Sequence, residues 1–462
     1  MKEQIIIACD SFKGCLESGE VASAVTEGIR KAIGESRKVN AYIKKSEIIQ
    51  DEDTESIDIV IIEVGDGGEG TGKILTNSLG GETVTVSVKD PLGRIINAQY
   101  GITSKVMSSE ITAGEATEKG RDLANWESGN KTAIIEMAQA SGLTLLSKDE
   151  RNPLLTSTYG TGEMILDAVG KGCRRFLIGI GGSATNDGGT GMLEALGFKF
   201  LDKMGKEIKG CCGGRLGEIA DIDSKSVSQE ILDSEFIVAC DVTTPFCGEE
   251  GATRIFARQK GADEEALESL ESGMQSFAHV INHKYGIKLN EIPGTGAAGG
   301  LGGAFKAFLN AELKSGIDMI LDAAGFDEII NDATLVITGE GKIDFQSSRG
   351  KVIDGICRRC RAKHIPVLAI AGIIDDICHS SATNKDHHTG IVDHNCHTDD
   401  RLPIKEGEKN TDGKDSGKDE YLTVLPIGPR PQNESDLEYA MRPEVARRNI
   451  TDTIIKILPE FL

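Results

Sequence analysis

The sequence predicts an α/β protein built on parallel β-sheets, with more than one domain, and three observations lead to these expectations. Short continuous apolar runs recur along the chain, and glycine-rich or acidic turns follow them. The chain has 56 glycines and only 4% aromatic residues, which indicates many tight turns and loops lined by backbone. Its 462 residues exceed the size that one hydrophobic core usually serves, so two domains are expected.

The first strand–turn–helix unit lies at the beginning of the chain. The apolar run at residues 5–9 predicts a buried strand, and the turn DSFKG follows it. Over residues 19–33 apolar side chains recur at helical spacing, which predicts a helix with Ser18 as its N-cap. Further apolar runs of the same form are predicted strands, and they lie at residues 57–64, 132–138, 175–182, 333–341 and 365–372.

Three polar stretches interrupt this pattern, and we expect them to be surface insertions because they lack periodicity and carry much charge. They lie at residues 46–58, 103–130 and about 379–420. The last holds five of the eight histidines and Cys396, and Cys357-x-x-Cys360 precedes it. A second closely spaced Cys/His pair is missing, which favours ordinary side chains over a structural metal site.

Charge and hydropathy exclude several classes of partner. A net charge of −22 opposes binding to nucleic acid and to anionic lipid, whereas a local basic cluster still permits a small anionic substrate. No stretch approaches the ~20 apolar residues that span a bilayer, and the first apolar run is too short for a signal peptide. The eleven cysteines then indicate reduced thiols, so we expect a cytoplasmic protein.

Two glycine motifs resemble nucleotide-binding fingerprints but lack a necessary part. Gly67, Gly72 and Lys73 have P-loop spacing, yet Ile74 stands where a hydroxyl must ligate Mg²⁺. A G-x-G-x-x-G motif starts at Gly294, but no apolar strand precedes it, which weakens a nicotinamide oxidoreductase interpretation. Its glycine turn still suits an anion or an adenine nucleotide, with a helix predicted through apolar positions from 304 to 313.

The densest polar cluster follows the predicted strand at 175–182. Glycines there surround Ser183, Thr185, Asn186 and Asp187, and a helix comes next, which favours an anion site. Asp187 is a negative charge in such a site, so it either binds a metal, accepts a proton or caps the helix. Acids and bases that suit Mg²⁺ and phosphate also follow other strands, namely Asp241, Arg254, Arg258, Lys260, Glu340, Lys342, Asp344, Arg349 and Lys351. Each basic residue alone is more often a solvated surface charge.

Together these segments resemble the type II glycerate kinase family, whose members phosphorylate glycerate with ATP. The motifs that carry the resemblance occur in family order, and they are ACDSFKG, GDGGEGT, KDPLGR, IEMAQASGL, RNPLLTSTYGTGE, GIGGSATNDGGTGMLEALG, ACDVTTPFCGEEGA, RQKGA, GTGAAGGLGGA and VITGEGKIDFQS. The resemblance resumes at TVLPIGPRPQNESDLEYAMRPEVARRNI, as a last strand and helix. Cys9 stands where the family usually has Pro, and Thr244 stands where it usually has Asn, so the side-chain amide contact of that Asn is in doubt, although a hydroxyl can donate one hydrogen bond.

The resemblance implies a flavodoxin-like α/β domain formed by residues 1–75 and 290–462, with a second α/β domain inserted at 76–289 and the active site in the cleft. It implies ATP and Mg²⁺ as cofactors and D-glycerate as the substrate, with 2-phosphoglycerate favoured over 3-phosphoglycerate. The sequence does not set the oligomeric state. An alternative is a catalytically silent regulatory or binding protein on a kinase fold, although the retained polar residues speak against it.

The resemblance also assigns roles to particular residues. Asp187 is expected to face the attacking hydroxyl, and Lys13 to pair with the substrate carboxylate or the transferred phosphoryl group. Mg²⁺ takes only one or two protein carboxylates, so the candidates Asp66, Asp241, Glu340 and Asp344 cannot all be ligands. The predicted substrate- and phosphate-binding residues are Asp10, Ser11, Ser183, Thr185, Asn186, Lys260, Gly296, Gly299 and Lys342.

Overall fold

The computed structural model describes residues 3–12, 14–34, 37–42, 56–65, 67–68, 70–104, 131–343, 352–374, 422–428 and 434–462. Most of the first and second predicted insertions and all of the third lie outside these residues. The described chain forms two compact units, which are Met1–Asp66 with Phe326–Leu462, and Gly67–Gly325.

The first unit joins both ends of the chain in one parallel sheet, whose described strands run in the order β15-β14-β13-β1-β3-β2. The strands are β1 (Glu3–Cys9), β2 (Val39–Tyr42), β3 (Ile57–Ile61), β13 (Leu335–Ile343), β14 (Val367–Ile374) and β15 (Leu422–Pro426). The helices are α1 (Ser18–Ile33), α12 (Phe326–Ile329), α13 (Val352–Arg361), α14 (Glu434–Ala440) and α15 (Pro443–Ile457). The predicted parallel α/β fold is confirmed in this unit.

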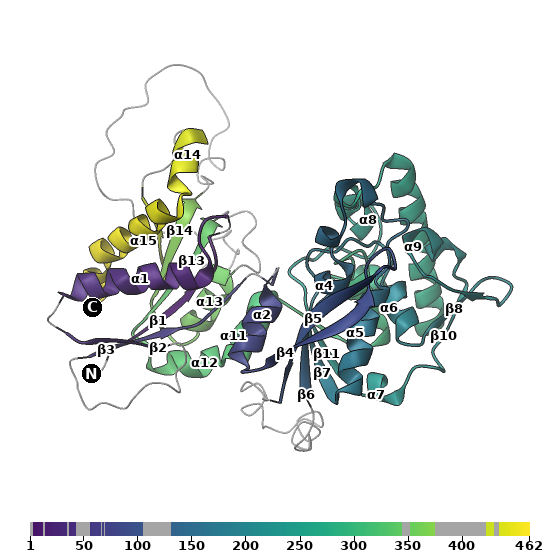
Figure 1. Ribbon diagram of the computed structural model, residues 1–462, viewed down its shortest axis with the longest axis horizontal. Coiled ribbons are helices and arrows are strands. Elements are labelled where there is room, and N and C mark those ends of the chain that lie inside the picture. The colour runs from purple at the N-terminus through teal and green to yellow at the C-terminus, as the bar shows by residue number, and fades with distance from the viewer. Residues whose placement is uncertain are drawn as a thin grey trace, which may run out of the picture. The chain divides into compact units, whose positions relative to one another are not determined.

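Helices cover both faces of this sheet because successive strand residues point to opposite sides. Leu368 and Ile370 of β14 belong to the core beneath α1 and α15, which lie side by side (Figure 1). Ala369 and Ala371 instead pack in the cluster that Ile353 of α13 covers. The two faces therefore form separate hydrophobic cores.

The contact between α1 and α15 explains a glycine inside a helix. A Cβ at Gly28 would lie 2.7 Å from Cβ of Ile454, so only glycine permits this approach. The predicted Ser18 cap is wrong, because the N-cap is Glu17, which forms a capping box with Glu20. Ser18 is already helical, and its hydroxyl donates to the Cys9 carbonyl at 2.6 Å.

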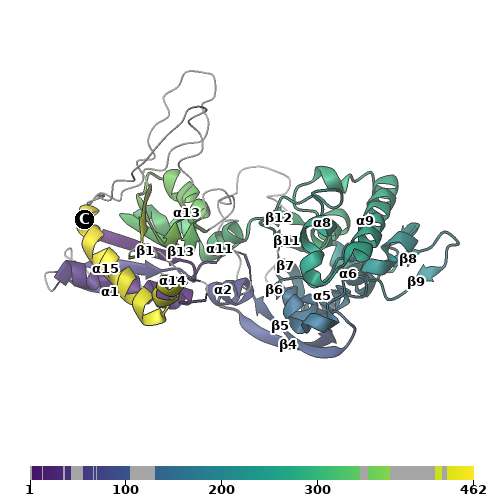
Figure 2. The same ribbon diagram turned by 90° about the horizontal axis from the view of Figure 1, so that it is seen from above.

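The second unit has a mixed sheet in the strand order β12-β11-β7-β6-β5-β4, as far as the chain is described. The strands are β4 (Glu82–Lys89), β5 (Ile95–Thr103), β6 (Lys131–Glu136), β7 (Cys173–Gly179), β11 (Glu235–Ala239) and β12 (Glu312–Lys314). From β6 to β12 the pairing is parallel, whereas β4 and β5 add an antiparallel edge (Figure 2). The sequence predicted only parallel strands, so the antiparallel pairing of β4 and β5 differs from that prediction.

Helices and a small antiparallel sheet complete the second unit. The small sheet contains β8 (Lys199–Leu201), β9 (Glu207–Ile208) and β10 (Asp221–Asp223). The helices are α2 (Thr71–Ser78), α4 (Ala138–Ser141), α5 (Tyr159–Gly170), α6 (Thr190–Ala195), α7 (Gln229–Leu232), α8 (Ala252–Phe256), α9 (Glu264–Tyr285), α10 (Leu301–Phe308) and α11 (Gly316–Ala324). Within the described residues, no helix is long and apolar enough to cross a membrane.

The boundaries between the units differ from the predicted positions 75/76 and 289/290. The first lies after Asp66, and the second lies after Gly325. The second boundary comes later because β12 pairs with β11 at the edge of the second unit's sheet, which keeps this segment there. Leu313 therefore lies in a strand, and the helix predicted to reach it ends at Phe308.

Candidate active site

The turn after β7 is held by its neighbours and by glycines. The Ala184 amide donates to the Ser141 carbonyl, and the Leu143 amide donates to the Gly182 carbonyl, so the turn is paired with the last residue of α4 and the segment that follows it. Gly189, with φ of 74°, is the N-cap of α6. A side chain there would overlap Ala304 of α10. The glycines thus permit a left-handed turn and close packing at once.

Asp187 is fully buried at the beginning of α6. Its Oδ2 accepts hydrogen bonds from the Thr158 amide at 2.8 Å and the Gly191 amide at 3.2 Å, and its Oδ1 accepts one from the Gly189 amide at 3.1 Å. Burial raises the pKa of Asp187, although these hydrogen bonds oppose the shift. Because the Gly189 and Gly191 amides lie at the beginning of α6, Asp187 stabilises this end of the helix from two residues before its N-cap, Gly189.

Thr158 is a partner of Asp187 that the sequence analysis missed. Its hydroxyl donates to Asp187 Oδ2 at 2.8 Å and accepts from the Met192 amide at 2.9 Å. Thr158 lies directly before α5 and is itself fully buried. The stretch TSTYGT offers several hydroxyl groups, and no local pattern distinguishes the one that reaches Asp187.

Lys260 reaches the same turn from the 3-10 helix η7 (Arg258–Lys260). Its Nζ donates to Ser183 Oγ and to the Thr185 carbonyl, each at 2.7 Å, and the residue is only 2% exposed. Burial lowers the pKa of Lys260 to about 7, and the charge of Asp187 opposes this shift. The structure therefore brings Ser183, Thr185, Asp187 and Lys260 together, as residues of one predicted site.

Two buried polar atoms in this turn lack a hydrogen-bond partner among the described residues. They are Thr185 Oγ1 and Asn186 Oδ1, and both residues are fully buried. The amide nitrogen of Asn186 is occupied, because it donates to Thr253 Oγ1 of α8 at 3.0 Å. Because nearly all buried polar groups in proteins are paired, these two atoms fit a site that takes a small polar ligand or water.

Gly296 and Gly299 lie in a buried loop that packs against this turn. A Cβ at Gly299 would overlap the Thr185 carbonyl, and one at Gly296 would overlap the Pro245 carbonyl. The Gly188 amide also donates to the Gly299 carbonyl at 2.9 Å. Close backbone packing is thus a sufficient reason for glycine here, and phosphate binding by these residues stays a prediction.

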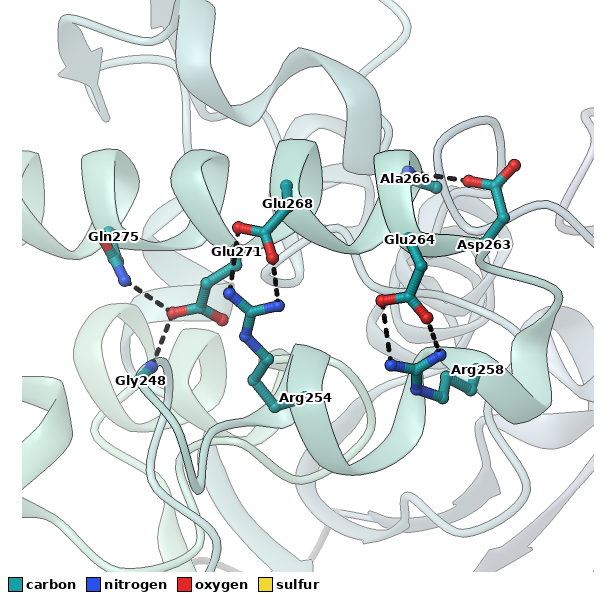
Figure 3. Close-up of polar contacts among 9 residues, drawn as sticks. All are labelled: Gly248, Arg254, Arg258, Asp263, Glu264, Ala266, Glu268, Glu271 and Gln275. Atoms are coloured by element: carbon teal, nitrogen blue, oxygen red, sulfur yellow. Dashed lines mark hydrogen bonds and ion pairs between the residues drawn. The ribbon is translucent and has the colours of Figure 1, made fainter.

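The basic residues Arg254 and Arg258 do not join the buried cluster. Each guanidinium group forms a two-point ion pair with a glutamate of α9, Arg254 with Glu268 and Arg258 with Glu264 (Figure 3). Both glutamate side chains are well exposed, at 68% and 74%. Arg258 is therefore a solvated surface charge, as is usual for a lone basic residue, whereas Arg254 is only 24% exposed and is held by its ion pair.

Asp241 follows β11, whose last residue, Ala239, pairs with Gly179 at the end of β7, so Asp241 lies at the same edge of the sheet as the turn after β7. Its Oδ1 accepts from the Gly316 amide at 2.8 Å, at the beginning of α11. Gly67 has a φ of 82°, and a side chain there would overlap Asp241 Oδ2. The glycine motif around Gly67 thus approaches an exposed carboxylate, and Lys73 is simply part of α2, as expected.

The remaining described candidates lie in the first unit, on neighbouring strands. Asp10 follows β1, and its amide donates to the Gly339 carbonyl of β13 at 2.9 Å, next to Glu340. The Ser11 amide donates to Asp10 Oδ1 at 2.6 Å. Asp10 and Glu340 are largely buried, whereas Lys342 is exposed. Lys13, Asp66 and Asp344 lie outside the described residues.

The described carboxylates fit Mg²⁺ in their chemistry. No group of three or more Asp, Glu, His or Cys residues suited to a metal occurs in the described part of the chain. Mg²⁺ does not require such a group, because it keeps several waters and takes one or two carboxylates. Asp241 and Glu340, each at or near the carboxyl end of a parallel strand, are hard oxygen donors of the kind it prefers.

The fold and these sites define an α/β protein with polar, glycine-lined turns at the carboxyl ends of parallel strands, where such proteins bind small ligands. Comparison with known proteins shows which family the chain belongs to. The model described as the glycerate kinase family matches residues 5–412. The "Glycerate 2-kinase" of Escherichia coli (strain K12) is 41% identical over 373 residues, which cover 81% of this chain and 86% of that protein.

Further matches agree. The "Glycerate kinase" of Halalkalibacterium halodurans is 40% identical over 368 residues, 80% of this chain and 85% of that protein. A crystal structure from Salmonella typhimurium LT2, provisionally assigned as glycerate kinase 2, superposes with a TM-score of 0.68 at 32% identity and covers 98% of each chain. The chain belongs to the glycerate kinase family, so it is an enzyme of the kinase class that acts on glycerate, as predicted.

Proposed function

We propose that the protein transfers the γ-phosphoryl group of ATP to D-glycerate and that 2-phosphoglycerate is the product. The observation that carries the proposal is the 41% identity to a glycerate 2-kinase across four fifths of the chain. The buried polar turn after β7 supports it, because phosphoryl transfer depends chiefly on positioned polar groups and charge neutralisation.

Mg²⁺ belongs to this proposal as the ion that neutralises charge on the phosphates. Asp241 and Glu340 are alternative candidates among the described residues and Asp66 and Asp344 are further candidates from the sequence, and only one or two of these four carboxylates would hold the ion. Lys13 is proposed to pair with the substrate carboxylate or the transferred group, and Asp10 and Ser11 to contact substrate. A cytoplasmic location is also part of the proposal, since every described cysteine is a free thiol.

For Asp187 we propose that the carboxylate orients or deprotonates the attacking hydroxyl. Oδ2 has three donors, two from Thr158 and one from Gly191, whereas Oδ1 has only the Gly189 amide among the described contacts. Oδ1 is thus the oxygen with capacity to accept a further proton or hydrogen bond. A raised pKa, caused by burial, suits a group that accepts a proton.

A coupled assay of ADP release tests the reaction class. Wild-type protein with ATP, Mg²⁺ and D-glycerate is expected to release ADP, and the release should depend on glycerate. An increase of NAD(P)H absorbance with the same acid, without ADP release, would favour the oxidoreductase alternative. Glycerate binding without turnover would favour a catalytically silent binding protein.

A further inference from the structure

The side chain of Lys260 makes contacts that differ from those of a phosphate ligand. Its ammonium group is enclosed, and both of its recorded acceptors, Ser183 Oγ and the Thr185 carbonyl, belong to one short turn. A buried lysine is costly unless its hydrogen bonds are made, so these two contacts must be satisfied by the fold itself. The side chain thus links two distant parts of the second unit.

The base of this side chain is fixed by its surroundings. Gly261, with φ of 96°, follows Lys260, and a Cβ there would overlap the Arg151 carbonyl, so the backbone is packed closely. The apolar residues Ala257, Leu267 and Leu270 join η7 and α8 to α9 in one small core. The Arg254–Glu268 and Arg258–Glu264 pairs span the same junction (Figure 3).

The other end of the link is the turn that carries Asp187. The Thr185 carbonyl, which accepts from Lys260, also lies against Gly299, and Asn186 is tied to Thr253 of α8. A shift of Ser183 or Thr185 would therefore change the position of Asp187, two residues further along the chain. Misplacement of a reacting group by about 1 Å can cost ~10²-fold in rate.

We propose that Lys260 is a positioning residue, which holds the turn at residues 183–187 in place through Ser183 and Thr185 and does not itself bind phosphate. The inference rests on the proposed function only where kinase activity is the readout. Loss of the proton would not break the link, because a neutral amine still has two N–H groups for two acceptors. This agrees with a pKa that burial lowers to about 7.

The experiment compares Lys260→Met, Lys260→Gln and Ser183→Ala with wild type. Lys203→Met is the matched control, because this lysine is exposed in the same unit. Two readouts are measured, namely amide hydrogen exchange over residues 184–191 without substrate, and kcat and KM for ATP and glycerate. The exchange measurement does not depend on the substrate, so it remains valid even if wild type does not phosphorylate glycerate.

The proposal predicts that Lys260→Met speeds exchange in this turn and lowers kcat by ~10²-fold, with both KM values within about twofold. Lys260→Gln, which keeps an N–H donor, should recover part of the loss. The double variant Ser183→Ala/Lys260→Met should be no worse than Lys260→Met alone, because both changes remove one link. The Lys203→Met control should match wild type.

Two results would overturn the proposal. The first is that Lys260→Met raises the KM for ATP about tenfold or more but leaves hydrogen exchange and kcat unchanged. That pattern is expected of a residue that binds phosphate. The other is unchanged kinetics and exchange in Lys260→Gln and Ser183→Ala, and these two variants decide the question if Lys260→Met does not fold.

Discussion

The turn at residues 183–187 and the surface between α8 and α9 both carry charged residues, yet they differ in burial. At the turn, Asp187 and Lys260 are both enclosed, and each is tied to a distant segment, Asp187 to Thr158 and Lys260 to Ser183. On the surface, Arg254 and Arg258 are paired with exposed glutamates. The difference teaches that a charge interacts strongly with its partners where the fold removes it from water, whereas an exposed ion pair contributes little.

Of the two regions, the buried turn should show the largest effects of substitution, and the largest is expected at Asp187. If the carboxylate accepts the hydroxyl proton, Asp187→Asn should lower kcat by ~10²–10⁴-fold. Asp187→Ala should also reduce the free energy of unfolding by about 2–4 kcal/mol, because the Thr158, Gly189 and Gly191 donors lose their acceptor. Steady-state kinetics and urea denaturation measure the two quantities, and an Asn variant with wild-type kcat would leave Asp187 as a helix cap only.

A smaller effect is expected at Thr158, which lies directly before α5 and bonds Asp187. Thr158→Val keeps the shape and the backbone donor but removes the hydroxyl that bonds Asp187 and Met192. The free energy of unfolding should fall by about 1–2 kcal/mol, and kcat by ~10-fold. Thr158→Ser retains the hydroxyl and is the control. Equal losses in the Val and Ser variants would show that the hydroxyl is not responsible.

The buried lysine should also make stability depend on pH. The pKa of Lys260 is lowered to about 7 in the folded protein, so between this value and the unfolded value the unfolded state binds more protons. Stability should therefore rise with pH from about 7, by at most ~1.4 kcal/mol per pH unit from this group.

The measurement is the difference in unfolding free energy between wild type and Lys260→Met from pH 6 to 9. This difference should shift in favour of wild type above pH 7, because the cost of a buried ammonium falls as the proton leaves. The raised thiol pKa of buried cysteines such as Cys211 is common to both proteins and cancels. A difference that is flat across this range would contradict the prediction.

The smallest effect is expected on the surface between α8 and α9. Arg258→Gln removes an ion pair whose partners are both well exposed, and such pairs contribute little. The midpoint of thermal unfolding should move by no more than ~2 °C, and kcat should be unchanged. A large loss of activity in this variant would break the distinction between the two regions.

Much of the fold follows from local sequence patterns. The apolar runs at 5–9, 132–138 and 175–182 correspond to β1, β6 and β7, because a continuous apolar run of this length has few alternatives to a buried strand. The antiparallel edge formed by β4 and β5 was not predicted. Strand direction depends on which segments pair, and local composition does not encode that.

The sequence could not predict which residues form hydrogen bonds with each other in the site. Lys260 and Ser183 are 77 residues apart, and Thr158 and Asp187 are 29 apart. Glycine and acidic residues after a strand predicted the turn itself, because that pattern is local. Which hydroxyl or carbonyl each charged group meets depends on how α5, η7 and the turn pack, so only the tertiary structure supplies the pairs.

The central claim is that the protein phosphorylates glycerate at the 2-hydroxyl with ATP, and ³¹P NMR of the product tests it most directly. After incubation of wild-type protein with ATP, Mg²⁺ and D-glycerate, we expect a new phosphomonoester signal that coincides with added 2-phosphoglycerate, together with ADP. A signal that coincides with 3-phosphoglycerate would contradict the assigned position. No phosphomonoester, with ATP unchanged, would contradict the kinase activity itself.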